Sequence, residues 1–204
     1  DGSRGFVLTP VEEADPEPAA TSISAPAIKQ VYGLPAKLQV TVTPSATGTV
    51  TVTAGNKRIT GNLSNGQASV ALPAKSLTPG TKTVAISYSG VAGKFSPSAT
   101  TTKVQVAKAK ATVKAKAAKT KVKRGKVAVF KIWVSNPSVK PTGKIRVTFA
   151  GKTKTVQLKN SSATIKIKVS KSTKPVAKTA KVTYLGNAFT AASATKKLKV
   201  TITG

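Results

Sequence analysis

Lysine is the side chain through which this sequence could do chemistry, because it is both abundant and regularly spaced. The 204 residues include 34 Lys and Arg but only 5 Asp and Glu, which gives a formal net charge of +29. Several lysines recur two residues apart, so they share one face of an extended strand. These pairs are Lys114 and Lys116, Lys152 and Lys154, Lys166 and Lys168, and Lys197 and Lys199. An array of ammonium groups attracts polyanions, so we take these eight lysines as candidate polyanion-binding residues.

The side chains that usually perform catalysis are missing from most of the chain. The sequence contains no His and no Cys, and all five acidic residues precede Pro18. From Pro18 to Gly204 no side-chain carboxylate can act as general acid, general base or calcium ligand. The absence of Cys excludes disulfide bonds and thiolate metal sites. The composition therefore predicts a non-catalytic protein that uses no metal and no other cofactor.

Positive charge is concentrated in the C-terminal half of the chain. Residues 18–108 hold 9 Lys and Arg, whereas residues 109–204 hold 24. We expect weak, salt-dependent binding to anionic cell-wall or surface polymers, mainly through the C-terminal half. The alternative is that the lysines keep the protein soluble and discourage edge-to-edge pairing of its strands.

The aromatic residues and the scarcity of Arg argue against sequence-specific binding of nucleic acid. The chain has 30 Lys but 4 Arg, and Arg is the side chain that pairs bidentately with bases and phosphates. Most of the nine aromatic residues fit core positions. Trp133 is the exception, because the period-two alternation places it on the other face of its strand from Phe130 and Ile132. It is a candidate contact residue, although we favour packing under lysine stems or against the other half of the chain.

The chain consists of two similar halves, each with the alternation of β-strands. Residues 31–42 align with residues 122–134 at an offset of 92, and Thr47-Gly48 aligns with Thr142-Gly143 at an offset of 95. Apolar and polar residues alternate with a period of two, which predicts strands packed on one side. Residues 107–123 are ambiguous, since Ala and Lys favour a helix by propensity. Their alternation favours a strand, which is our interpretation.

The order of short motifs carries a resemblance to a known family. In the first half Tyr32-Gly33 precedes one strand, Thr47-Gly48 opens the next, and Tyr88-Ser89-Gly90 ends a later one. This order resembles the tandem bacterial Ig-like repeats of secreted and surface proteins of Gram-positive bacteria. The second half departs from it, with Lys123-Arg124 replacing the Tyr and its neighbour and Leu185 replacing Ser89. The resemblance implies stalks, spacers and adhesive modules.

These observations predict an all-β protein of two tandem immunoglobulin-like β-sandwich domains with about seven strands each. We divide the chain into residues 1–21, the end of a preceding domain plus an acidic Pro/Ala-rich linker, then residues 22–108 and the strongly basic residues 109–204. The junction, residues 106–110, has no Gly or Pro, which predicts limited flexibility. No apolar run approaches the roughly 20 residues of a transmembrane helix.

The function that we expect is an extracellular or cell-surface spacer that adheres to anionic polymers by charge. One alternative is a C-terminal accessory module that keeps a secreted enzyme near a polyanionic substrate or the cell wall. Another is a pair of virion structural domains that adhere to host surfaces. We expect the isolated fragment to be monomeric.

Overall fold

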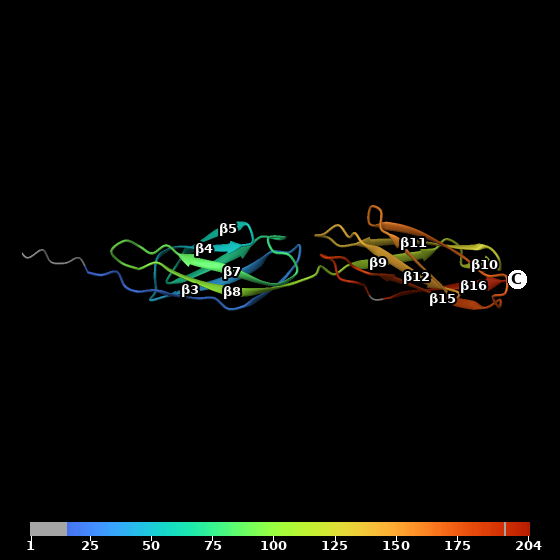
Figure 1. Cartoon of the computed structure of the whole chain (residues 1–204), viewed down its shortest axis with the longest axis horizontal. Helices are drawn as coiled ribbons and strands as arrows, with labels where there is room; N and C mark the ends of the chain where they lie inside the picture. Colours follow the sequence, from blue (N-terminus) through green and yellow to red (C-terminus); the bar gives the residue numbers. More distant parts are fainter. Residues whose placement is uncertain (1–15, 194) are drawn as a thin grey trace, which may run out of the picture.

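The structure, a computed structural model, is all-β over the residues that it describes, which are 16–193 and 195–204. The predictions made for residues 1–15 lie outside this range. Sixteen strands form four sheets, and no helix occurs in the described residues. Figure 1 shows two sandwiches arranged end to end along the long axis of the molecule. The all-β prediction is confirmed.

The first sandwich pairs a three-stranded sheet with a five-stranded sheet. Its strands are β1 (Ser22–Ser24), β2 (Ile28–Val31), β3 (Ala36–Thr43), β4 (Gly48–Ala54), β5 (Lys57–Leu63), β6 (Gln67–Leu72), β7 (Gly80–Tyr88) and β8 (Ser98–Ala107). One sheet has the order β1-β3-β6 and the other the order β2-β8-β7-β4-β5. All neighbours are antiparallel except β2 and β8, which are parallel.

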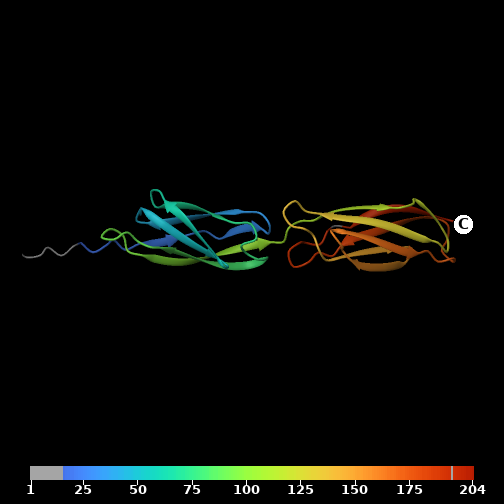
Figure 2. The same cartoon turned by 90° about the horizontal axis from the view of Figure 1, so that it is seen from above.

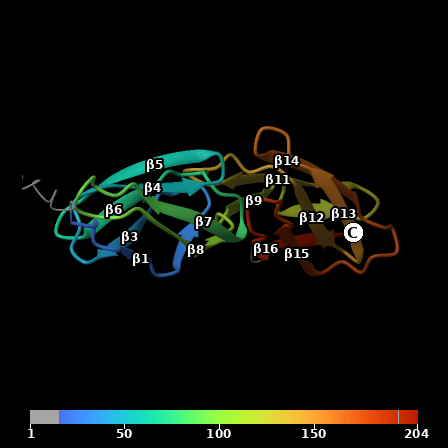
Figure 3. The same cartoon turned by 60° about the vertical axis from the view of Figure 1, so that its left-hand side comes forward.

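The second sandwich repeats this topology strand for strand. Its strands are β9 (Thr112–Ala117), β10 (Lys121–Lys123), β11 (Val127–Ser135), β12 (Lys144–Phe149), β13 (Lys152–Gln157), β14 (Ser162–Lys168), β15 (Ala177–Tyr184) and β16 (Lys196–Thr203). The sheets have the orders β14-β11-β9 and β10-β16-β15-β12-β13. Figure 3 shows the two layers of each sandwich. The duplication read from the sequence is therefore a duplication of the whole fold.

Each sandwich closes over its own hydrophobic core. Strand β3 buries Leu38, Val40 and Val42 in one core, and the matching strand β11 buries Phe130 and Ile132 in the other. Alternate residues of both strands point to solvent. Full burial of such side chains stabilises a fold by about 1.5–3 kcal/mol each. The same packing decides the ambiguous stretch 107–123, which forms β9 and β10 as a strand interpretation predicts.

A buried tyrosine occupies the same position in each sandwich. The Tyr88 hydroxyl donates a hydrogen bond of 2.7 Å to the backbone oxygen of Thr47, and the Tyr184 hydroxyl donates to the backbone oxygen of Thr142. Both side chains are fully buried. Each bond ties the end of one strand to the loop that enters its neighbour. Burial also raises the pKa of the Tyr88 hydroxyl above its ordinary value of 10.0.

The end of the acidic N-terminal segment is attached to the first sandwich. The backbone of Ala19 exchanges hydrogen bonds of 3.0 and 2.9 Å with Lys94 and Ser96, and the Thr21 hydroxyl donates to the backbone oxygen of Ser96 at 2.8 Å. The last residues of the predicted N-terminal segment 1–21, from Ala19 to Thr21, thus pack on the first sandwich.

The two sandwiches meet at a small junction (Figure 2). The ring of Tyr32 stacks on that of Phe189 with a centroid distance of 4.8 Å. The linker residue Ala109 is buried and exchanges two 2.9 Å backbone hydrogen bonds with the loop that carries Phe189. Gly33, with φ +90°, lies so close to Val139 that an added Cβ would meet Val139 Cγ2 at 2.6 Å. Contacts therefore restrain the junction beyond the linker itself.

Raising the pH above 10 should destabilise the first sandwich through Tyr88. In the unfolded chain the tyrosine ionises near pH 10, whereas burial keeps it neutral to higher pH in the fold. Its contribution to stability is therefore complete below pH 10 and is lost as the pH rises beyond. We expect Tyr88→Phe to make the free energy of unfolding fall less steeply with pH above pH 10. Tyr32→Phe, which changes a half-buried tyrosine, is the control and should keep the wild-type slope. Equal slopes for the wild type and both variants would contradict this.

Removing the aromatic contact at the junction should loosen it. Phe189→Ser eliminates a stacked pair of a kind that contributes about 0.5–1.5 kcal/mol. We expect small-angle scattering to show a broader distribution of interdomain distances, with both sandwiches still folded. Val176→Ser, which changes an apolar residue that is also exposed, is the control and should leave the profile unchanged. An unchanged profile for Phe189→Ser would mean that the other contacts, at Ala109 and Gly33, hold the junction without the stacked rings.

Candidate polyanion-binding faces

The outer face of the sheet β14-β11-β9 brings four of the eight candidate lysines together around the only tryptophan of the chain. We call it the tryptophan face; it consists of Lys114, Lys116, Val127, Val129, Lys131, Trp133, Lys166 and Lys168. These residues alternate with core residues along their strands, so the same period that builds the core sets their direction. The outward positions predicted for these four lysines are confirmed, while their binding role stays a prediction.

Trp133 lies at the centre of one row of this face. It pairs with Lys114 of β9 on one side and with Ser162 of β14 on the other. The Lys116 Nζ lies 5.6 Å from the ring centroid, within the range of a cation–π interaction. The ring nevertheless remains 42% exposed. The favoured interpretation placed it under lysine stems or against the other half of the chain; instead a lysine ammonium lies beside the ring, and Trp133 keeps a surface that a ligand could contact.

The outer face of the five-stranded sheet of the second sandwich forms a second basic surface. We call it the lysine–threonine face; its basic members are Lys121, Lys123, Lys144, Arg146, Lys181, Lys197 and Lys199. Lys181 is paired with Lys197 on one side and Thr148 on the other. Thr148 and Thr153 are joined by a 2.9 Å hydrogen bond between their hydroxyls. This face holds the candidates Lys197 and Lys199.

The remaining candidates, Lys152 and Lys154, do not point outward as predicted. The register of β12 and β13 pairs Lys152 with Phe149 and Lys154 with Val147, and both partners belong to the core. Directly paired residues share a side of the sheet. The two lysines thus lie on the core side of an edge strand, where the sandwich is open enough to leave them exposed. Inward charges on an edge strand discourage pairing with another chain.

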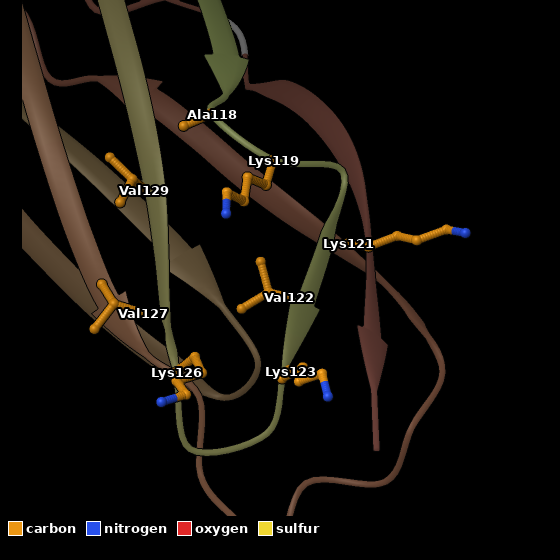
Figure 4. A pocket seen from close by; sticks show the side chains of 8 residues that line it. All are labelled: Ala118, Lys119, Lys121, Val122, Lys123, Lys126, Val127 and Val129. Atoms are coloured by element: carbon orange, nitrogen blue, oxygen red, sulfur yellow. The ribbon is translucent and has the colours of Figure 1, made fainter.

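A hollow of about 480 Å³ opens where the chain crosses from β9 to β10. Eight residues from three short segments line it, and four of them are lysines. They are Ala118, Lys119, Lys121, Val122, Lys123, Lys126, Val127 and Val129. Figure 4 shows Lys119 and Val122 pointing into this space and Lys121 pointing away from it. Because Val127 and Val129 also belong to the tryptophan face, the hollow lies at the end of that face.

No side-chain carboxylate follows Glu17, so the second sandwich has no acidic side chain to neutralise these surfaces. Within residues 16–193 and 195–204, no three His, Cys, Asp or Glu side chains gather as a metal site would require. The described part of the chain also has no helix long and apolar enough to cross a membrane. The chemistry that the faces offer is therefore that of exposed ammonium, hydroxyl and indole groups.

The first sandwich provides an internal comparison, because its strand pairing matches. The pair Ser24 and Thr41 stands where the second sandwich has Lys114 and Trp133. Likewise, Gln39 and Ser69 stand where Lys131 and Thr164 are paired, and Lys37 and Ala71 where Val129 and Lys166 are paired. On the larger sheet, Ala85 and Thr101 correspond to Lys181 and Lys197. The fold thus closes without the lysines and without the tryptophan.

Sequence reasoning missed several basic residues that the sheets place beside the predicted ones. Lys131 lies directly between Lys116 and Thr164, and Lys181 lies directly between Lys197 and Thr148. Neither belongs to a Lys-x-Lys pair, which was the signal used. An alignment of the two halves that marked positions gaining Lys would have found Lys131 opposite Gln39.

Comparison with a family model supports the fold of the first sandwich. Residues 22–107 match the family model of the bacterial Ig-like domain (group 3). No curated protein matches the chain. Among solved structures, the fibronectin(III)-like modules of Clostridium thermocellum CbhA are 14% identical, with 89% of this chain and 94% of that chain covered and a TM-score of 0.40. The adhesin InvE of Yersinia pseudotuberculosis is 14% identical, with 89% and 58% covered and a TM-score of 0.42. The first sandwich is therefore similar in sequence to the bacterial Ig-like domain (group 3).

Replacing Lys154 by Ile should stabilise the second sandwich without weakening polyanion binding. Ile59 occupies the matching position of the first sandwich, where it packs against the core. Partial burial of the new side chain should add about 0.5–1.5 kcal/mol to the free energy of unfolding. Denaturant unfolding followed by Trp133 fluorescence measures this change. A severalfold loss of affinity for heparin would show that Lys154 belongs to a binding face after all.

Proposed function

We propose that this protein is a non-catalytic, extracellular spacer whose second domain adheres to anionic surface polymers by charge. The observation that carries the proposal is the difference between two sandwiches with one topology. At matched outward positions Ser24, Gln39 and Ala85 are neutral in the first, whereas their counterparts in the second are lysines. Because the fold does not require these lysines, their accumulation on two faces points to a use outside the fold.

The chemistry of the faces favours anionic polymers over a compact ligand. Lysine ammonium groups are hydrated point charges on flexible stems, so they suit many anions rather than one fixed geometry. The two faces are sheet surfaces, and their charges are spread over several strands. A long polymer can contact many such groups at once, and each neutralised anion releases counterions. Affinity should therefore depend steeply on salt and weakly on polymer sequence.

The experiment measures binding of the full chain to heparin and to duplex DNA of mixed sequence across a salt series. With about five phosphates neutralised, DNA affinity should fall roughly 10² to 10³-fold between 50 and 200 mM salt. Two variants replace lysines by their first-sandwich counterparts. One is Lys114→Ser with Lys131→Gln and Lys166→Ala, and the other is Lys144→Thr with Lys181→Ala and Lys197→Thr.

Each variant should weaken binding and reduce the steepness of the salt dependence, by up to about 2.7 in the slope for three phosphate contacts. The matched control, Lys37→Gln with Lys94→Gln and Lys103→Gln, removes the same charge from the first sandwich and should change affinity less than about twofold. Equal losses for the control would assign binding to net charge alone. No binding by the wild type at low salt would overturn the proposal and leave the lysines a solubility role.

A further inference from the structure

Trp133 and its flanking lysines differ from the rest of the basic surface because they combine charge with an exposed aromatic ring. The lysine–threonine face holds ammonium and hydroxyl groups, whereas the tryptophan face adds an indole that is 42% exposed and Val127, which is 46% exposed. Strand β11 carries both, and a strand rises about 3.4 Å per residue, so they span about 20 Å. The outward residues of β11 are thus apolar at both ends of this span and basic between them, at Lys131. The two valines, Val127 and Val129, pair with lysines of β14, and Trp133 pairs with Lys114 of β9.

We infer that the tryptophan face binds an acidic polysaccharide, with Trp133 stacked on a sugar ring and Lys114, Lys116 and Lys131 paired with its acidic groups. This inference rests on the proposed function and names the class of polymer. The C–H face of a pyranose is flat and apolar, so it can cover an indole ring, while carboxylate or sulfate groups project from the edge of the sugar ring. Lys114 is the direct cross-strand neighbour of Trp133, and Lys131 is two residues away on the same strand.

The geometry prepares the ring for such a contact. Strand β11 is the central strand of its sheet, so its backbone is held on both sides. The Lys116 ammonium lies 5.6 Å from the ring centroid, which restrains one side of the indole and adds positive charge beside it. A ring restrained before binding loses less conformational entropy when a ligand covers it.

Other occupants fit this face less well. A second copy would bring like charges together, which disfavours association. A membrane would require the apolar groups to project beyond the charged ones, yet here Lys131 lies between the valines and Trp133, and a lysine is the cross-strand partner of each of these apolar residues. Single-stranded nucleic acid is held by successive stacked bases on several aromatic side chains. Trp133 is the only aromatic residue of this face.

The test compares two polyanions that differ in whether they contain sugar rings. Polygalacturonate carries a carboxylate on each pyranose, and polyphosphate carries charge without rings. The full chain is titrated with each at one ionic strength, and binding is followed by Trp133 fluorescence, which reports this face alone because the chain has one tryptophan. We expect polygalacturonate to change the emission and to protect the ring from a soluble quencher.

The decisive variant is Trp133→Thr, which installs the first-sandwich type of residue at an exposed position. Its affinity for polygalacturonate, measured by calorimetry, should fall about three- to tenfold, as expected for loss of one aromatic contact. Its affinity for polyphosphate should change less than twofold. Trp133→Phe should retain most of the binding. The control Lys181→Ala with Lys197→Thr, on the other sheet, should weaken both polymers in similar proportion.

Each other outcome overturns the inference in a recognisable way. If Trp133→Thr lost equal affinity for polygalacturonate and for polyphosphate, Trp133 would only support the lysines structurally. A larger loss for a poly-thymidine oligonucleotide than for polygalacturonate would assign the ring to bases, and a larger loss for vesicles of phosphatidylglycerol would assign it to membranes. If the wild type binds polyphosphate but not polygalacturonate, the inference fails and the proposed function stands. If it binds neither, both fail.

Discussion

The second sandwich carries 24 positive side chains and no acidic side chain that could neutralise them, so burial in its hydrophobic core must outweigh their mutual repulsion. It does so with large buried residues, including Phe130 and Phe149, whose rings meet edge to face at 5.4 Å. The lysine heads stay in water on their long stems, and physiological salt screens charges beyond about 8 Å. Because no acidic side chain is available to it for an ion pair, this sandwich relies on burial, backbone pairing and neutral side-chain hydrogen bonds such as that of Tyr184. No acidic side chain of this sandwich competes with an external anion for its ammonium groups. Those of Lys140 and Lys152 also donate hydrogen bonds, to Asn160 Oδ1 and to the backbone oxygen of Lys168.

The duplication separates what the fold requires from what the surface carries. Both sandwiches keep the same strand orders, the same inward alternation and the same tyrosine bonded to the loop of a neighbouring strand. Their outward positions differ, as Thr41 and Trp133 show. A strand position that faces water can change without disturbing the core on the other side of the sheet. Two copies of one scaffold can therefore diverge into a domain with 9 basic side chains and a domain with 24.

Local alternation was sufficient to predict the strands, because one buried face imposes a period of two on each of them. It predicted the outward Lys166 and Lys168 correctly for the same reason. It failed for Lys152 and Lys154, whose side of the sheet depends on register with β12 and on the open edge of the sandwich. It could not predict the contact of Gly33 with Val139 either, since that contact joins a turn of one domain to a loop of the other. Properties set by a partner segment are not encoded in the spacing of the segment itself.

Lysines spread over the outer faces of sheets would hold a polymer through many weak contacts. A single exposed ammonium–anion pair contributes little in water and is screened by salt. Many such pairs along one polymer act together, because the first contact raises the effective concentration of the next. Strong overall attachment then coexists with rapid exchange at each site. The junction adds a geometric condition, since Phe189 stacked on Tyr32 and the buried Ala109 restrain the second domain relative to the first. A restrained module presents its faces in a limited range of directions, so fewer orientations are lost when a polymer is bound.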